Sequence, residues 1–203
     1  MKFLIVYGHP YPHSFNHAIM TVFGDRLKEK GQDVIVRDLY AVRFDPVLKA
    51  EELEGFKKNV YPEDIRREQE YVRWADTLVF ISPIWWGGLT SIMRGYCDRV
   101  FSLNFAYRET ASGPQGLLNG KRGYLINTIG APVAIYEQAG LIESMKKTIG
   151  EIIFSFCSIT LAGHTFFGSV GNCSDEKRQE MLEEVRGIAD DLSGGMAPLQ
   201  KGP

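Results

Sequence analysis

Cysteine is scarce in this sequence, and the few cysteines form no recognisable pattern. The 203 residues include three of them, Cys97, Cys157 and Cys173, with no Cys-x-x-Cys pair. An odd number without paired spacing argues against a disulfide framework and against a thiolate zinc site. It also favours a reducing compartment.

An excess of charge of either sign is missing as well. Lysine and arginine number 23 and aspartate and glutamate 25, so the net charge is −2. A nucleic-acid-binding protein normally carries a basic excess. We therefore expect no nucleic-acid partner.

Long hydrophobic runs are absent from the sequence too. The first apolar run, residues 3–7, is too short for a signal peptide or a membrane span. We therefore expect a cytoplasmic protein without direct membrane insertion.

The apolar runs that are present are short and alternate with helical patterns. Unbroken apolar runs are typical of parallel strands that are covered on both faces. They predict strands at residues 3–7, 34–36, 77–81, 124–126 and 159–163. Apolar spacing and capping residues predict helices at 16–30, 63–74, 90–101, 136–155 and 175–192.

This order predicts one doubly wound α/β domain over residues 1–192, with helices on both faces of a five-stranded parallel sheet. Residues 40–62 are a long charged connection with room for a short helix or a lid. Residues 193–203 are rich in glycine and proline and predict a flexible tail.

In such a sheet, ligands bind beyond the carboxyl ends of the strands. The loop after the first strand, residues 8–16, has neither a G-x-G-x-x-G nor a G-x-x-x-x-G-K-[ST] motif, which disfavours an ordinary Rossmann site and a nucleotide triphosphatase. It nevertheless leads into a helix N-terminus, which favours a phosphate. Ser14 and Asn16 add side-chain donors there, and His9 adds partial positive charge. The alternative is that Ser14 or Asn16 only caps the helix.

The histidines at positions 9, 13 and 17 are spaced by four, as in a metal-binding stripe on a helix. Pro10 and Pro12 keep this stretch out of a helix. We therefore predict no metal site.

The loop after the third strand places Trp85 and Trp86 directly before two glycines. Two large aromatic surfaces beside backbone that a ligand can approach closely favour a flat ring system. The alternative is a core tryptophan followed by the entry to a helix.

Together these motifs resemble the NAD(P)H:quinone oxidoreductases of the flavodoxin-like fold. The resemblance spans roughly residues 2 to 192 and rests on five segments in order. They are His9-Pro10 with Ser14-Phe15-Asn16, Pro83-x-Trp85-Trp86-Gly87, the stretch Ile92-Met93-Arg94-Gly95-Tyr96-x-Asp98-Arg99-Val100-Phe101, Phe105-Ala106-Tyr107, and Thr128-x-Gly130. The fold implied is a sheet of strand order 2-1-3-4-5.

The resemblance also implies a flavin cofactor, FAD with FMN as the alternative, and NAD(P)H as co-substrate. By position, the flavin phosphates and ribityl chain are matched to His9, Ser14, Phe15 and Asn16. The isoalloxazine ring is matched to Pro83, Ile84, Trp85, Trp86, Gly87, Thr128, Ile129, Gly130 and Ala131. The adenylate half of FAD is matched to Gln69 and Arg178. Two tyrosines are implied in catalysis, Tyr136 near the flavin pyrimidine edge and Tyr107 in the pocket wall.

Two departures from the mammalian quinone reductases bear on mechanism. Ile142 stands where they have a histidine six residues after the tyrosine, so a Tyr–His proton relay does not carry over. Glu109 stands where they have a second tyrosine, which changes the pocket wall.

The favoured function is two-electron, ping-pong hydride transfer from NAD(P)H through flavin N5 to a quinone or similar acceptor, with azo and nitro acceptors on the same site also considered. The segment His9-Pro10-Tyr11-Pro12-His13 is similar to that of ancillary subunits of potassium-efflux systems, which use FMN. An alternative is therefore a flavin-binding regulatory subunit with a membrane antiporter as partner. A single-electron carrier is disfavoured by the nearly neutral charge. A homodimer is expected because the resemblance implies a pocket completed by a second chain, and because an apolar patch is otherwise left exposed at Trp85, Trp86, Phe105 and Tyr107.

Overall fold

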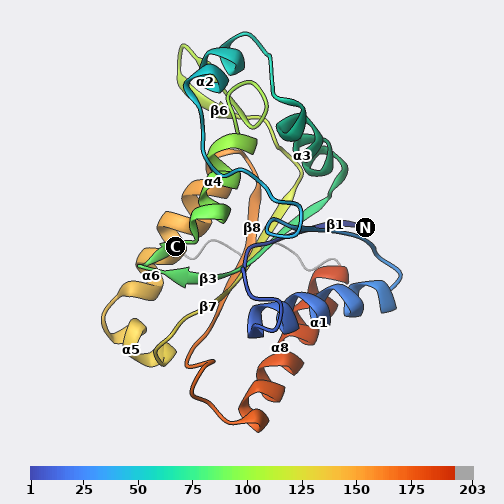
Figure 1. The fold of residues 1–203 in the computed structure, drawn as a ribbon, viewed down its shortest axis with the longest axis vertical. Helices are drawn as coiled ribbons and strands as arrows, with labels where there is room; N and C mark the ends of the chain where they lie inside the picture. Colours follow the sequence, from blue (N-terminus) through green and yellow to red (C-terminus); the bar gives the residue numbers. More distant parts are fainter. Residues whose placement is uncertain (195–203) are drawn as a thin grey trace.

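Five parallel strands form the central sheet of the computed structural model, in the order β2-β1-β3-β7-β8 (Figure 1). The structure describes residues 1–194. The strands are β1 (Lys2–Tyr7), β2 (Asp33–Asp38), β3 (Thr77–Trp85), β7 (Arg122–Thr128) and β8 (Thr160–Phe167). Counted along the chain, this order is 2-1-3-4-5, which confirms the predicted sheet.

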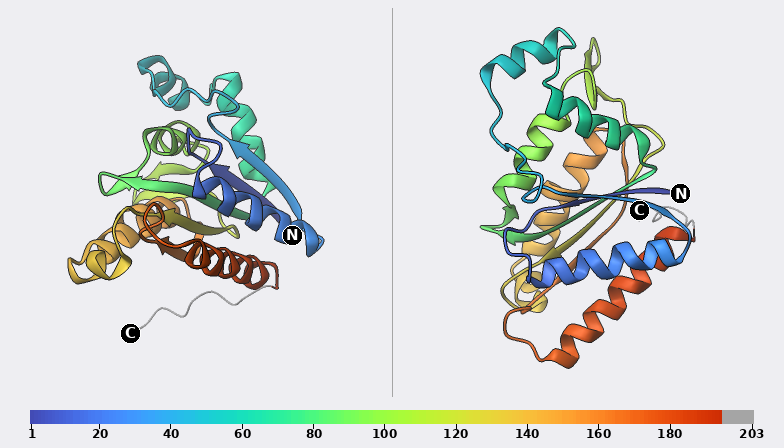
Figure 2. Two further views of the ribbon diagram at one scale, coloured as in Figure 1. Left: turned by 60° about the horizontal axis from the view of Figure 1, so that its bottom comes forward. Right: turned by 45° about the vertical axis from the view of Figure 1, so that its right-hand side comes forward.

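Helices cover both faces of the sheet (Figure 2). One face carries α1 (Phe15–Glu29) and α8 (Asp175–Ser193), which pack against each other. The other carries α3 (Glu63–Trp74) and α4 (Ser91–Val100). Alternate residues of β1 supply the two cores, with Phe3 and Ile5 on the α1 side and Leu4 on the other, because successive strand side chains point to opposite faces.

Local sequence sets where the helices begin. Ser14 accepts a hydrogen bond from the His17 N–H at the start of α1, and Ser174 accepts one from the Lys177 N–H at the start of α8. These contacts satisfy N–H groups that a helix itself leaves unpaired.

The predicted helix at 136–155 is wrong as a single element. The segment holds α5 (Val133–Gln138), α6 (Leu141–Met145), the π-helix η1 (Lys146–Glu151) and α7 (Ile152–Phe156). Gly140 has a φ of 69° and separates α5 from α6. A left-handed residue of this kind ends a helix, and glycine adopts the conformation without steric cost.

The third strand is longer than predicted. It continues through Pro83 to Trp85 and turns back at Trp86 and Gly87 into β4 (Gly88–Leu89). A second, unpredicted hairpin joins β5 (Tyr107–Thr110) and β6 (Gly113–Gly116).

The long connection at 40–62 holds a short helix, α2 (Ala50–Lys57). Glu52 anchors it through a buried ion pair with Arg99 of α4. Arg99 also reaches Asp64 of α3 at 2.9 Å, so one guanidinium joins three helices.

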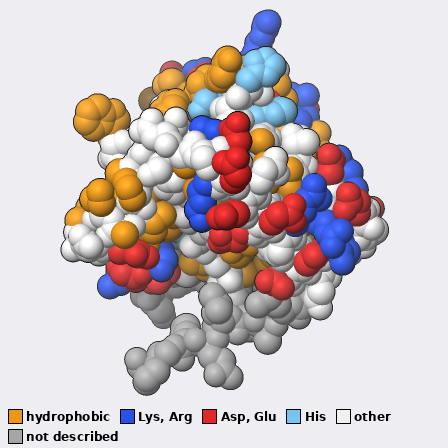
Figure 3. Space-filling model, turned by 90° about the horizontal axis from the view of Figure 1, so that it is seen from below, with side chains coloured by type: hydrophobic (Ala, Val, Ile, Leu, Met, Phe, Trp, Pro, Cys, Tyr) orange, Lys and Arg blue, Asp and Glu red, His pale blue; other side chains and the backbone are white. Residues whose placement is uncertain are grey.

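The predicted flexible tail at 193–203 falls largely outside the described residues, and Ser193 is still part of α8. Within residues 1–194 no helix combines the length and the apolar character that a membrane crossing requires. On the face in Figure 3, acidic and basic side chains are intermixed.

Candidate functional site

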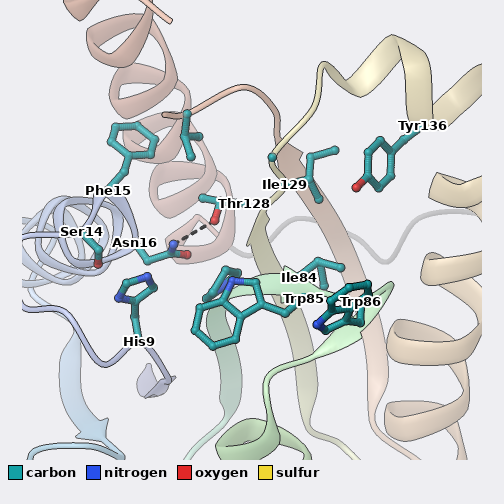
Figure 4. Close-up of a pocket in the computed structure, with 13 residues that line it drawn as sticks. His9, Ser14, Phe15, Asn16, Ile84, Trp85, Trp86, Thr128, Ile129 and Tyr136 are labelled. Atoms are coloured by element: carbon teal, nitrogen blue, oxygen red, sulfur yellow. Dashed lines mark hydrogen bonds between the residues drawn. The ribbon is translucent and has the colours of Figure 1, made fainter. Parts of the chain in front are cut away.

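A pocket of about 480 Å³ opens at the carboxyl ends of β1, β3 and β7. This volume lies in the range of small-molecule sites. Figure 4 shows its walls, with His9 and Ser14 at one end and Tyr136 of α5 at the other. The lining comprises His9, Ser14, Phe15, Asn16, Pro83, Ile84, Trp85, Trp86, Thr128, Ile129, Gly130, Tyr136 and Val170.

The N-terminus of α1 supplies the polar end. The backbone N–H groups of Phe15 and Asn16 belong to the first turn and have no carbonyl within the helix to bind. The Ser14 hydroxyl lies 3.2 Å from the Tyr7 hydroxyl, which holds it at the pocket edge. Among residues 1–194, no lysine, arginine or carboxylate lines the pocket, so the helix N-terminus is its main feature that attracts an anion.

Asn16 and Thr128 form the floor. Asn16 Nδ2 donates a 2.8 Å hydrogen bond to Thr128 Oγ1, and both residues are buried. Asn16 Oδ1 is buried without a partner among the described residues. The Thr128 hydroxyl accepts from Asn16, so its own proton is free to donate. A free acceptor beside a free donor suits the hydroxyl groups of a polyol chain.

His9 presents a neutral imidazole to the pocket, so the partial positive charge expected of it is wrong. Its Nδ1 accepts a 3.0 Å hydrogen bond from the Tyr11 N–H, which leaves Nε2 to carry the proton. Burial lowers the pKa of His9 below its usual value. The ring lies edge-to-face against Trp85, with centroids 6.0 Å apart.

The two tryptophans occupy a tight turn rather than the core. Trp86 and Gly87 have φ values of 54° and 74°, the double left-handed conformation of a type I′ hairpin turn. Trp85 is 46% exposed and Trp86 fully exposed. A bulky residue in this backbone region is strained. The alternative of a core tryptophan followed by a helix entry is therefore wrong, because neither indole is in the core. Both indoles remain available to a flat ligand or a second chain.

Tyr136 lines the pocket from the first turns of α5, which follows the loop after β7. Ile142, at the position of the family histidine, is buried in the apolar core. No imidazole therefore stands behind Tyr136 at that position.

Other predicted residues lie next to the pocket. Gly87 completes the hairpin turn, and the carbonyl of Ala131 accepts a hydrogen bond from the Ser169 N–H. Arg178 donates to the carbonyl of Val170, so it supports a lining residue that the sequence reasoning missed. Val170 lies in the loop after β8, and only this place in the chain could have pointed to it.

Two predicted residues lie apart from the pocket. Gln69 is fully buried and donates to the Val100 carbonyl and the Ser102 hydroxyl, so its expected contact with an adenylate group is wrong for this chain conformation. Tyr107 packs on Phe156, with ring centroids 4.9 Å apart, and does not line the pocket of a single chain.

The donor set suits a flavin better than a metal ion. No cluster of three histidine, cysteine or carboxylate side chains with metal-binding geometry occurs in residues 1–194. The pocket instead joins an anion-binding helix end, a hydroxyl-binding floor and an indole wall. These three features match the phosphate, the ribityl chain and the ring system of a flavin in that order.

Comparisons with known proteins agree with this fold and site. A family model described as flavodoxin-like fold matches residues 1–188. A Haemophilus influenzae protein named an uncharacterized NAD(P)H oxidoreductase is 34% identical over 184 residues, 90% of this chain and 91% of that protein. Human ribosyldihydronicotinamide dehydrogenase (quinone) is 32% identical over 201 residues, 89% of this chain and 87% of that protein.

A solved structure is similar over nearly its whole length. The NAD(P)H:quinone oxidoreductase from Methanothermobacter marburgensis has a TM-score of 0.87 and 25% identity, covering 97% of this chain and 99% of that one. By sequence and by fold, the chain belongs to the NAD(P)H:quinone oxidoreductase family of the flavodoxin-like fold and is an oxidoreductase enzyme.

Proposed function

We propose that this chain is a flavin-dependent NAD(P)H:quinone oxidoreductase that works by two-electron, ping-pong transfer. The observation that carries the proposal is that the α1 N-terminus, the Asn16–Thr128 floor and the Trp85 wall line one and the same pocket. The named activities of its relatives support the reaction class.

The FMN portion of the cofactor is supported best. Phe15 and Asn16 offer backbone N–H groups to a phosphate, and Asn16 Oδ1 with the Thr128 hydroxyl holds the ribityl chain. For the adenylate half of FAD, Gln69 is buried and Arg178 remains as the predicted contact. The pocket residues therefore support FMN better than FAD.

The flavin, when bound, supplies the hydride chemistry at N5. The chain orients the reactants and adjusts the charge around them. Trp85, a lining residue, offers an aromatic face on which the flavin ring would stack. The Tyr136 hydroxyl, which also lines the pocket, would donate a hydrogen bond at the edge of the flavin where negative charge develops. Ile142 cannot relay a proton, so solvent and backbone N–H groups would stabilise the remaining negative charge on the flavin.

In this proposal, a second copy of the chain completes the part of the pocket where NAD(P)H and the quinone bind. Trp86 is fully exposed, and Tyr107 lies outside the pocket of one chain. Phe105, expected in the same exposed patch, is buried, so that part of the prediction is wrong. A homodimer covers such apolar surface. Light scattering at micromolar concentration is expected to give twice the mass of the chain, and a mass near 23 kDa contradicts the dimer.

The proposal is tested by a visible spectrum of the purified protein, with the released cofactor identified by mass. Yellow protein that bleaches with NADPH and recovers its colour with menadione supports the reductase. Yellow protein that ignores both NADH and NADPH points to the flavin-binding regulatory subunit. Protein that stays colourless after incubation with FMN or FAD rules out the flavin.

A further inference from the structure

A chain of polar side chains lies one layer beneath the pocket and joins three strands. His164 of β8 donates from Nε2 to Asn127 Oδ1 of β7 at 2.7 Å. Asn127 Nδ2 in turn donates to the Ser82 carbonyl of β3 at 2.7 Å and lies 3.3 Å from the Ser82 hydroxyl. Ser82 and Asn127 are fully buried. None of the three lines the pocket.

The direction of these hydrogen bonds is fixed. The Ser82 carbonyl can only accept, so the Asn127 amide must donate to it and turn Oδ1 toward β8. Oδ1 then requires a donor, which His164 supplies as the Nε2–H tautomer. Burial, and after it the charge of Lys146, lowers the pKa of His164 to about 3, so the ring stays neutral.

The hydrogen bond to Asn127 sets the orientation of the His164 ring. Nδ1 is buried and has no hydrogen-bond partner among the described residues. It faces Gly150 of the π-helix, where a Cβ atom would come within 3.4 Å of it. The Phe166 ring packs against the imidazole at a tilt of 30°, with ring centroids 4.0 Å apart. Among the described residues, the imidazole therefore makes one hydrogen bond, to Asn127.

The two residues in the hydrogen-bond chain that starts at His164 each directly precede, in the sequence, a residue that lines the pocket. Ser82 precedes Pro83, and Asn127 precedes Thr128. Pro83 pairs with Thr128 in the sheet register but has no N–H to give to the ladder. The Asn127 side chain supplies a donor at the point where the proline weakens the pairing of β3 and β7.

We propose that His164 is a positioning residue for the flavin pocket. It acts through Asn127, and by that contact it holds the segment that begins at Ser82 and the floor residue Thr128. This inference rests on the proposed flavin function, because the pocket it positions is the flavin site. A residue that only stabilised β8 would affect unfolding without affecting the geometry of the pocket.

The test compares three variants. His164→Leu removes the donor, and His164→Gln restores an N–H group near the position of Nε2. Thr165→Val is the matched control, since the Thr165 hydroxyl bonds the Tyr124 hydroxyl at 2.8 Å and so belongs to the neighbouring residue of the same strand. Thermal unfolding is recorded for all of them.

Two readouts separate positioning from stability. The first is the dissociation constant of FMN, and of FAD, by fluorescence titration of the apoprotein. The second is hydrogen exchange of peptides that cover residues 82–86 and 128–130, measured without flavin. We expect His164→Leu to weaken FMN binding about tenfold, as the loss of one buried hydrogen bond does, and to speed exchange in both peptides. His164→Gln is expected within about twofold of the wild type, a difference too small for such a loss. Thr165→Val is expected to lower only the unfolding temperature.

Two results overturn the proposal: a His164→Leu protein that unfolds earlier yet binds FMN and exchanges like the wild type, or a His164→Gln protein as impaired as His164→Leu. A wild-type protein that binds neither FMN nor FAD contradicts the proposed function itself. The exchange measurement still decides in that case whether His164 positions these two segments.

Discussion

The side chain of Asn16 hydrogen-bonds that of Thr128 at 2.8 Å, across 112 positions of the chain, and so ties the start of α1 to the end of β7. This hydrogen bond links the helix N-terminus at one end of the pocket to the pocket floor. Asn16 lines the pocket, and its amide oxygen has no hydrogen-bond partner among the described residues.

Replacing Asn16 is therefore expected to weaken flavin binding. Asn16→Leu removes both the free acceptor and the bond to Thr128, and we expect the FMN dissociation constant to rise at least about tenfold, or 1.4 kcal/mol. Fluorescence titration measures it. Thr128→Val removes the bond and the Thr128 hydroxyl but keeps the free acceptor of Asn16, so it is expected to give a smaller loss. Equal losses would assign no role to the free oxygen.

Tyr136→Phe is expected to slow flavin reduction about tenfold, the effect of losing one hydrogen bond of 1–1.5 kcal/mol in the transition state. The affinity for FMN is expected to stay close to the wild-type value, because the ring is kept. Stopped-flow mixing with NADPH gives the rate. An unchanged rate removes Tyr136 from the mechanism.

The buried ion pair between Glu52 and Arg99 is expected to control the stability of the connection at 40–62. Glu52→Gln leaves a buried guanidinium with one exposed carboxylate partner, Asp64, and we expect the free energy of unfolding to fall by about 3 kcal/mol. Glu63→Gln is the control, because its pair with Arg66 is exposed. The control is expected to change stability by less than about 0.5 kcal/mol, and urea unfolding measures both. Similar small losses would show that Glu52 is dispensable.

His164 is expected to make stability depend on pH. Its pKa is about 3 in the folded chain against a usual value of 6.5. Between these values the unfolded chain binds a proton that the folded chain does not, so stability is full above pH 6.5 and falls as the pH drops. From pH 7 to pH 5 this amounts to about 2 kcal/mol.

Urea unfolding of the wild type and of His164→Gln at both pH values isolates this contribution. The variant has no titrating ring at this position, so it is expected to lose less stability than the wild type as the pH falls. Parallel losses in the two proteins would refute the assignment.

Cysteine reactivity is expected to be confined to Cys173. Burial raises the pKa of Cys97 and of Cys157 to about 12, whereas Cys173 is half-buried at the edge of α8. Native protein treated with iodoacetamide at pH 8 is therefore expected to carry one label, located by peptide mass spectrometry. Unfolded protein takes three. Rapid native labelling of Cys97 or Cys157 would contradict the packing around them.

Much of the fold followed from local pattern. Unbroken apolar runs such as residues 77–81 predicted every strand of the parallel sheet, because strands buried on both faces admit few polar residues. The first helix, predicted at residues 16–30, agrees with α1 to within one residue at each end, because capping depends only on neighbouring residues. Most pocket residues were predictable as well, since strand ends meet at one edge of such a sheet.

Other features were decided by tertiary contacts. No local signal placed Gln69 in the core or His164 beside Asn127, because each depends on a partner at least 31 positions away. The π-helix η1 packs against β8, a contact that no local pattern indicates. The sequence by itself determined where the five parallel strands lie along the chain and the edge of the sheet at which a ligand binds. Only the tertiary structure decided which polar side chains are satisfied and which remain free to bind, because hydrogen bonds between distant strands are made only when the sheet has formed.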